Sequence, residues 1–141
     1  MAGAIIANPI YPSVDVPFTT LEAKNPLYEG IPHVYAEPSI EGRIRAVARS
    51  YGVDENLAVA VAKAESDFRP NVQNASSTAS GIFQFINGTW KDFCLTKYEL
   101  ATSTSQKNDP DIQIECAVRM ISEGGLNHWD ASRFLWQNYD R

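Results

Sequence analysis

The sequence predicts a mainly α-helical domain preceded by an irregular, proline-rich N-terminal arm, and three observations support this class. Six of the eight prolines lie within the first 38 residues, where proline removes backbone donors and disfavours helix in the residue before it. From residue 39 onward, apolar side chains recur at helical spacing behind residues that cap helices well. A length of 141 residues, with 44% hydrophobic and 21% charged residues, fits one small globular domain.

Residues 1–38 form the predicted arm, and residues 39–141 the helical domain. The arm carries many Ile, Val, Leu, Tyr and Phe side chains, which makes it too apolar for a free linker. We therefore expect part of it to pack on the domain, either beside a ligand groove or, as the simpler arrangement, as a cover over the core.

Two helices are predicted directly after the arm. Ser39 caps the first, which has Gly52 as its stop. Its apolar residues at helical spacing are Ile40, Ile44, Val47 and Tyr51. Asp54 caps the second helix, whose alanine-rich stretch 57–64 leads directly to Glu65. The second helix is expected to be largely buried.

A third helix is predicted over about residues 87–98, and the polar stretch 102–108 is predicted to be an exposed loop. The third helix places Trp90, Phe93 and Cys94 on one face. A fourth helix begins at Asp109, with Pro110 in the first-turn position that tolerates a missing N–H. Its expected apolar face is Ile112, Cys116, Ala117, Met120 and Ile121, and Gly124–Gly125 end it. The tail, residues 128–136, is expected to form a last turn or helix packed by its aromatic side chains.

Glu65 is the leading candidate for chemistry. A carboxylate at the end of a buried helix loses hydration and lies near the negative end of the helix dipole, and both effects disfavour its ionisation. A carboxyl group that stays protonated near neutral pH is what a general acid requires. The alternative is a surface glutamate that happens to follow a core helix.

The segment 74–85 is the second candidate, because small and hydroxyl residues lead to Gly81 and then to Gln84 between Phe83 and Phe85. Small residues let backbone approach a ligand closely. A glutamine between aromatic residues needs a partner, either backbone or a polar ligand. Aromatic faces beside amide groups suit a sugar with an N-acetyl substituent. The alternative is a polar loop followed by a core strand or turn.

These segments together resemble the catalytic core of the lytic transglycosylases, the soluble-lytic-transglycosylase and goose-type-lysozyme-like branch of the lysozyme superfamily. The family pattern has three blocks: Glu-Ser-x-Phe-x-Pro, then Ser-x-Ala-x-Gly-(Leu/Ile)-(Met/Phe)-Gln, then Thr-Trp or Thr-Ala. The matching residues are Glu65, Ser66, Phe68 and Pro70, then Ser77, Ala79, Gly81, Ile82, Phe83 and Gln84, then Thr89 and Trp90. The resemblance covers roughly residues 40–123 and implies a lysozyme-like helical domain.

The chain departs from the family pattern at three points. Thr78 stands where the family usually has glycine, and Val72 where it often has alanine. The family's later tyrosine, whose hydroxyl approaches the catalytic glutamate, has no clear counterpart. Tyr98 and Tyr139 are the available tyrosines, and each is more simply explained as a packing residue.

The resemblance implies an enzyme that cleaves peptidoglycan with one glutamate acting twice. Protonated Glu65 donates to the oxygen that links N-acetylmuramic acid to N-acetylglucosamine, and then deprotonates the muramoyl 6-hydroxyl, which closes a 1,6-anhydro ring. The residues expected at the substrate site are Ser66, Ser80, Gly81, Phe83, Gln84 and Phe85. Gln84 and the backbone near Ser80 and Gly81 are expected to orient the sugar, and Phe83 or Phe85 to keep the site dry. Ser66 is expected to bond to Glu65 or to the helix end.

Two other functions remain open. A hydrolase of the same fold, a lysozyme-type muramidase, requires a second carboxylate to activate water. The aspartates available for this are Asp67, Asp92, Asp109 and Asp111. A non-catalytic peptidoglycan-binding module would keep the groove without turnover, although the combination of Glu65, Ser66 and Gln84 argues against it.

Cys94 and Cys116 are the two cysteines of the chain. An even pair in an exported protein predicts a disulfide, and the alternative is two buried free thiols. His33 and His128 lie far apart and outside any metal-ligand spacing. We therefore expect no metal and no cofactor, and a packing or surface role for His128.

The charge and hydropathy of the chain limit the classes of partner and the location that we expect for it. The net charge of −5, with no run of Lys or Arg, predicts no nucleic-acid surface. The resemblance implies that the partner is the glycan strand of peptidoglycan, and we expect a monomer. The first seven residues are apolar but short and lack a basic start, which makes a poor signal peptide. We expect an extracytoplasmic protein that is either a mature region or carried by another route, such as a phage particle.

Overall fold

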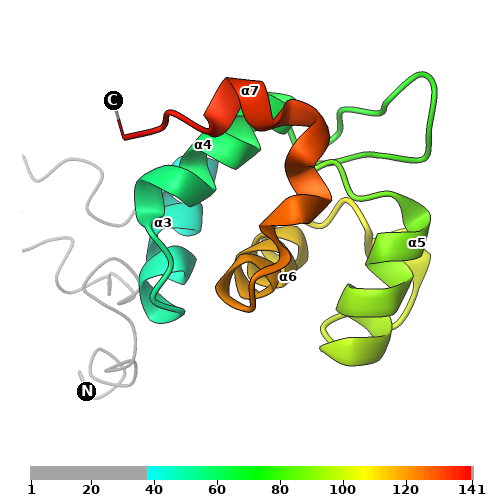
Figure 1. The fold of residues 1–141 in the computed structure, drawn as a ribbon. Helices are drawn as coiled ribbons and strands as arrows, with labels where there is room; N and C mark the ends of the chain where they lie inside the picture. Colours follow the sequence, from blue (N-terminus) through cyan, green and yellow to red (C-terminus); the bar gives the residue numbers. More distant parts are fainter. Residues whose placement is uncertain (1–37, 141) are drawn as a thin grey trace, which may run out of the picture. The chain divides into compact units, whose positions relative to one another are not determined.

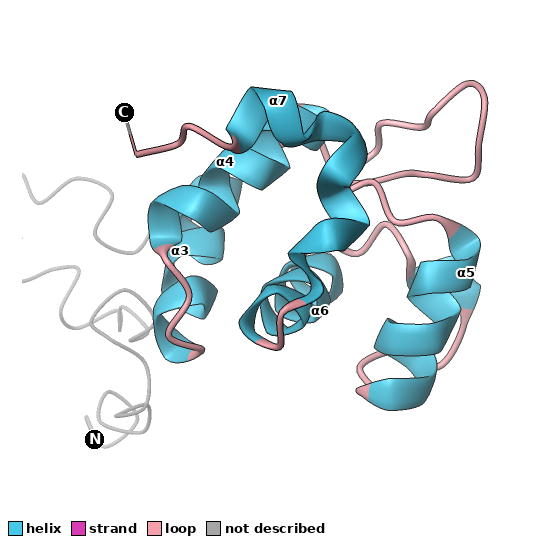
Figure 2. Cartoon of the chain, in the orientation of Figure 1, coloured by secondary structure: helices cyan, strands magenta, loops and turns pink. Residues whose placement is uncertain are grey.

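The computed structural model describes residues 38–140, and Ser39–Arg141 forms one compact unit. The predicted arm, including its packing on the domain, lies outside the described residues apart from Pro38. The elements in chain order are α3 (Ile40–Ser50), α4 (Glu55–Ser66), α5 (Asn87–Thr89), the π-helix η3 (Trp90–Lys97), the 3-10 turn η4 (Thr104–Gln106), α6 (Pro110–Ser122), the 3-10 segment η5 (Gly125–Ser132) and α7 (Arg133–Trp136) (Figure 1). The mainly helical class is confirmed, and within residues 38–140 the only β pairing is two isolated bridges (Figure 2).

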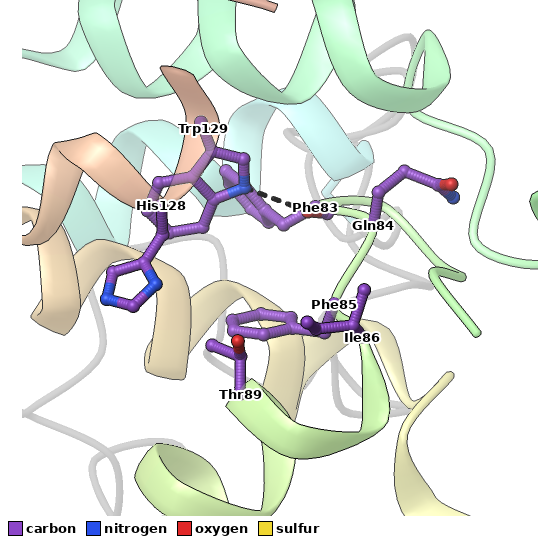
Figure 3. Close-up of a pocket in the computed structure, with 7 residues that line it drawn as sticks. All are labelled: Phe83, Gln84, Phe85, Ile86, Thr89, His128 and Trp129. Atoms are coloured by element: carbon purple, nitrogen blue, oxygen red, sulfur yellow. Dashed lines mark hydrogen bonds between the residues drawn. The ribbon is translucent and has the colours of Figure 1, made fainter. Parts of the chain in front are cut away.

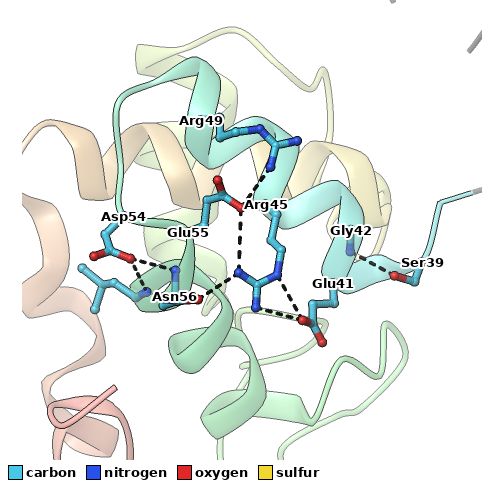
Figure 4. Close-up of polar contacts among 9 residues, drawn as sticks. Ser39, Glu41, Gly42, Arg45, Arg49, Asp54, Glu55 and Asn56 are labelled. Atoms are coloured by element: carbon cyan, nitrogen blue, oxygen red, sulfur yellow. Dashed lines mark hydrogen bonds and ion pairs between the residues drawn. The ribbon is translucent and has the colours of Figure 1, made fainter. Parts of the chain in front are cut away.

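The capping residues begin the helices as the sequence predicts. The Ser39 hydroxyl accepts from the Gly42 N–H at 3.0 Å, and the Asp54 carboxylate accepts from the Asn56 N–H at 2.8 Å (Figure 4). Asp109 caps α6 in the same way. Each cap satisfies an N–H that has no partner inside its helix, so the start of each long helix is determined locally.

Polar contacts on the surface fix how α3 meets α4 (Figure 4). The Arg45 guanidinium bonds to Glu41 at 3.0 Å and to Asn56 at 2.9 Å, and Arg49 bonds to Glu55 at 2.9 Å. Exposed ion pairs of this kind contribute at most about 1 kcal/mol each. They therefore contribute little to the stability of the fold.

The core lies where α6 is packed against α3, η3 and η5. α6 is the most buried helix because its inward positions are apolar through its length. Its buried residues are Gln113, Ile114, Cys116, Ala117, Val118 and Met120. Ile112 and Ile121, expected on this face, are partly buried and pack at its edge. The single polar member of the set, Gln113, belongs to the site described below.

The third predicted helix is present, but most of it has π geometry. After the single turn of α5, the chain continues as η3, and the Tyr98 N–H donates to the Phe93 carbonyl at 2.8 Å, five residues back. Trp90, Cys94 and Tyr98 lie four residues apart, and all three are buried. The wider turn keeps this four-residue stripe facing the core, a feature that residue spacing alone did not reveal.

Two sequence expectations need correction. The stretch 102–108 is not wholly exposed, because it contains η4 and the buried side chain of Lys107. In the tail, Trp129 and Trp136 are buried as expected, but Phe134 and Leu135 on α7 are 71% and 59% exposed. Within the described residues, the helices are each too short or too polar to cross a membrane.

A disulfide joins Cys94 of η3 to Cys116 of α6, with Cα atoms 5.6 Å apart. The bond closes a loop of 22 residues, which the chain-entropy model values at about 3 kcal/mol.

Reduction of this bond should lower the melting temperature while the glycan cleavage expected from the resemblance survives at low temperature, because neither sulfur lies at the candidate site. Thermal unfolding with and without reductant, together with alkylation and intact mass under denaturing conditions, measures both effects. Two thiols that alkylate without reductant would contradict the bond in solution.

Candidate active site

Glu65 lies in the last turn of α4, with its side chain half-buried. Burial raises the pKa of Glu65 above its ordinary value, and a hydrogen bond from Ser132 acts in the opposite direction by favouring the carboxylate. α4 ends directly afterwards, because Asp67 adopts the left-handed conformation with φ of 53°. The carboxyl group is therefore held at a helix end, where it retains some access to solvent.

Ser132 is the residue that contacts Glu65, and sequence reasoning missed it. Its hydroxyl donates to Oε1 of Glu65. The same hydroxyl lies 3.2 Å from the Trp129 carbonyl and accepts from the Trp136 indole N–H at 3.1 Å. Ser132 ends η5 and immediately precedes α7, so it lies between two buried tryptophans. That Trp-x-x-Ser-x-x-x-Trp spacing is the signal that could have identified it.

Neither tyrosine considered from the sequence reaches the glutamate. The Tyr98 hydroxyl donates to Glu123 at 2.7 Å, and the Tyr139 hydroxyl donates to Asp54 at 3.3 Å. The hydroxyl bonded to Glu65 is supplied by a serine instead.

Ser66 and Ser80, both expected to bind substrate, are buried and bonded inside the protein. The Ser66 hydroxyl donates to the Ile82 carbonyl at 2.8 Å, and the Ser80 hydroxyl donates to Asn108 at 2.7 Å. The first bond ties the end of α4 to the segment 74–85, and the second ties that segment to the start of α6. Both hydroxyls therefore have hydrogen-bond partners within the protein.

Gln113 of α6 is fully buried and hydrogen-bonds to the segment 74–85. Its Oε1 accepts from the Phe83 N–H at 2.9 Å, and its Nε2 donates to the Ser80 carbonyl at 2.9 Å and the Lys107 carbonyl at 2.7 Å. Gly81 has φ of +84°, and a Cβ there would lie 2.2 Å from Gln113 Nε2. Glycine is thus required at position 81 for both its conformation and the close approach of Gln113.

Gln84 bonds to backbone, one of the two partners that the sequence allowed. Its Nε2 donates to the Val72 carbonyl at 3.0 Å and to the Gly81 carbonyl at 2.9 Å. Val72 contributes its carbonyl to this contact, so its departure from the family's alanine leaves the contact possible.

Thr78, which replaces the family's glycine, has a structural partner of its own. Its hydroxyl accepts from the Asn87 N–H at 2.9 Å, and its carbonyl accepts from the Lys107 ammonium. Lys107 also donates to the Asn87 side chain at 2.6 Å. Burial lowers the pKa of Lys107, and these contacts compensate for the hydration it loses. Thr78 therefore anchors its loop to the start of α5.

A cavity of about 170 Å³ opens beside this segment. Its lining residues are Phe83, Gln84, Phe85, Ile86, Thr89, His128 and Trp129 (Figure 3). The Trp129 indole N–H donates to the Phe83 carbonyl at 2.9 Å, which joins η5 to the segment 74–85. Phe83 and Phe85 have buried rings that meet Trp129 edge to face.

His128 lies at this cavity, although the sequence suggested only a packing or surface residue. Its exposed ring meets Phe93 edge to face with centroids 5.1 Å apart. Within residues 38–140, no three His, Cys, Asp or Glu side chains form a group that could hold a metal.

The four aspartates considered as a second carboxylate are engaged or exposed elsewhere. Asp109 caps α6, and Asp111 pairs with Arg43 at 2.8 Å. Asp67 and Asp92 are exposed. None of the four is among the described residues that line the cavity or hydrogen-bond to Glu65.

Comparison with known proteins places this site in a family. Residues 43–132 match the transglycosylase SLT domain. Over 70 residues, the chain is 33% identical to "Probable transglycosylase SceD" of Staphylococcus aureus strain Newman and equally to that of strain USA300. The match covers 49% of this chain and 29% of each relative, so the chain spans less than a third of their length in this alignment. No solved structure matches the chain. Because the family match includes Glu65, the segment 74–85 and Ser132, the chain belongs to the transglycosylase SLT domain family, whose fold is lysozyme-like.

Proposed function

We propose that this chain is a peptidoglycan lytic transglycosylase that cleaves the bond between N-acetylmuramic acid and N-acetylglucosamine. One observation carries the proposal: Glu65 is a half-buried carboxyl group with a raised pKa, and it accepts a hydrogen bond from Ser132. The same hydroxyl lies 3.2 Å from the carbonyl of Trp129, a residue that lines the aromatic cavity. Burial keeps such a group protonated to higher pH, as a general acid requires.

The proposed reaction uses Glu65 first as an acid and then as a base. Its proton passes to the glycosidic oxygen while the bond from that oxygen to the muramoyl anomeric carbon breaks. The muramoyl 6-hydroxyl then bonds to the anomeric carbon and gives its proton to the Glu65 carboxylate. The glutamate ends protonated as it began, and no water is consumed. None of the four aspartates is among the described residues that line the cavity, which supports this route over hydrolysis.

We assign substrate binding to the cavity that Phe83, Gln84, Phe85 and Trp129 help to line. About 170 Å³ accommodates one substituent of a sugar, such as an acetamido group, rather than a whole disaccharide. Gln84 commits its amide nitrogen to two backbone carbonyls, and its amide oxygen is then the group offered to a sugar N–H or hydroxyl. Ser66, Ser80 and Gly81 act by holding this segment in place.

This assignment implies action outside the cytoplasm, where peptidoglycan is found. A route through the cell envelope and delivery on a phage particle are both compatible with it. The glycan strand is the proposed partner, and a single chain carries the whole proposed site.

Products released from purified peptidoglycan should carry 1,6-anhydromuramoyl ends, which are one water lighter than the products of hydrolysis. Mass spectrometry of the soluble muropeptides measures this difference directly. Reducing-end N-acetylmuramic acid as the main product would establish a muramidase instead. Binding to the glycan without release of fragments would establish a non-catalytic module.

A further inference from the structure

A short hydrogen-bonded chain joins Glu65 to Ser132, Trp129 and Trp136. The proposed reaction assigns it no role. The Trp136 indole N–H lies 3.1 Å from Ser132 Oγ, and this hydroxyl donates to Oε1 of Glu65. The Trp129 carbonyl, 3.2 Å from the same hydroxyl, is a second possible acceptor. Trp129 and Trp136 are both buried, so bulk water competes little for these groups.

The hydroxyl of Ser132 has one hydrogen and two acceptors within reach. An ionised carboxylate is a stronger acceptor than a neutral carboxyl group, so the hydrogen favours Glu65 when Glu65 is charged. When Glu65 is protonated, its carboxyl oxygen and the Trp129 carbonyl are acceptors of more similar strength for this hydrogen. The Trp136 N–H is shared between the Ser132 oxygen at 3.1 Å and the Trp129 carbonyl at 3.2 Å. Its bond to the Ser132 oxygen occupies an acceptor position there and limits how that hydroxyl can turn.

We propose that Ser132 is a positioning residue for Glu65. It holds Oε1 so that Oε2 carries the transferable proton, and it shares its hydrogen between Glu65 and the Trp129 carbonyl according to the charge on Glu65. Within the proposed reaction, on which this catalytic role rests, the bond strengthens when Glu65 gives up its proton and weakens when the proton returns. One glutamate is thereby supported in both of its roles.

The other charged groups on the elements around Glu65 do not account for the shift in its pKa. Those groups are Lys63 and Asp67 at the end of α4, Arg69 after it, His128 and Asp130 in η5, and Arg133 in α7, and all are exposed. Asp130 and Arg133 also pair with each other. The described surroundings shift the pKa of Glu65 through burial first, which raises it, and through Ser132 second, which lowers it.

Ser132→Ala should therefore raise the pKa of Glu65, because it removes the bond that favours the carboxylate and leaves the burial. The expected rise is roughly 1–2 pH units, which is what the loss of a hydrogen bond to a charged group amounts to on the pKa scale. The pKa is measured by titrating the Glu65 side-chain carboxyl carbon by NMR. In the same variant, the alkaline limb of kcat/KM for glycan cleavage should move to higher pH, and kcat should fall about tenfold from lost orientation.

Three variants separate positioning from general damage. Ser132→Thr restores a hydroxyl and should bring the Glu65 pKa back toward wild type. Trp136→Phe removes the indole N–H and should shift the pKa in the same direction as Ser132→Ala but less. Ser122→Ala, at an exposed serine that bonds only to the Arg119 carbonyl, should change neither the pKa nor the pH profile.

An unchanged or lowered Glu65 pKa in folded Ser132→Ala protein would overturn the inference. The NMR titration does not depend on turnover, so it decides the role of Ser132 even if the wild-type chain releases no fragments. Absence of cleavage by wild type would count against the proposed function alone. Cleavage by wild type with an unshifted profile in Ser132→Ala would count against the inference alone.

Discussion

Glu65→Gln should reduce glycan cleavage by roughly 10²–10⁴-fold, the contribution typical of a positioned general acid or base. Glutamine keeps the shape of the side chain and an oxygen that accepts the Ser132 hydrogen bond, but it cannot transfer a proton. Since the described part of the chain brings no other carboxylate into contact with Glu65, no neighbouring group is available to take over. Release of soluble muropeptides from purified peptidoglycan, measured at matched concentrations, gives the ratio.

Glu99→Gln is the matched control, because Glu99 is exposed and its change removes the same charge. It should leave cleavage unchanged. Circular dichroism and the urea midpoint should show that Glu65→Gln protein is folded, and slightly stabilised if removing a partly buried ionisable group relieves its desolvation. Near-wild-type cleavage by folded Glu65→Gln protein would rule out Glu65 as the proton-transfer group.

Gln113→Leu should have the largest effect on stability, with a loss of about 3 kcal/mol or more. Leucine fills a similar volume but leaves the Phe83 N–H and the Ser80 and Lys107 carbonyls without their partner. Each unsatisfied buried polar group costs roughly 1–3 kcal/mol. That sum is a large fraction of the 5–15 kcal/mol that typically stabilises a domain. Urea unfolding measures this loss, which should appear as a lower midpoint with an unchanged dependence of the free energy of unfolding on urea concentration.

The same change should also impair the site in protein that remains folded, because Gln113 holds the segment that lines the cavity. Cleavage should therefore fall at temperatures well below the midpoint. Gln137→Leu, at an exposed glutamine of the tail, is the control. It should change neither the free energy of unfolding nor the cleavage. A Gln113→Leu protein within about 0.5 kcal/mol of wild type would show that these three hydrogen bonds are replaced by water or by local rearrangement.

The starts of the three long helices were predictable because they depend on neighbours in the sequence. Ser39, Asp54 and Asp109 each accept a hydrogen bond from an N–H two or three residues ahead. The placement of Glu65 in the last turn of α4 likewise follows from the apolar run before it. Local chemistry suffices for features of this kind.

The roles of Ser66 and Ser80 could not be predicted in the same way. Ser66 matches a family motif and Ser80 stands at a variable position inside another, which suggested contact with substrate, but their hydroxyls bond to partners 16 and 28 residues away. The bonding partner in the folded chain cannot be read from the position of a residue in a motif. Thr78 illustrates the same point, since its contact with Asn87 turns a departure from the pattern into an anchor.

The sequence by itself determined the helical class, the caps, the family resemblance and the candidacy of Glu65, because each depends on short-range spacing and residue type. Only the tertiary structure decided which hydroxyl meets the carboxyl group, since Ser132 is 67 residues from Glu65 along the chain. It also decided that Gln113 holds the motif segment and that His128 and Trp129 line the cavity. These contacts arise when α6 packs against the segment 74–85 and the tail packs against α4. No local pattern encodes the distances between segments so far apart.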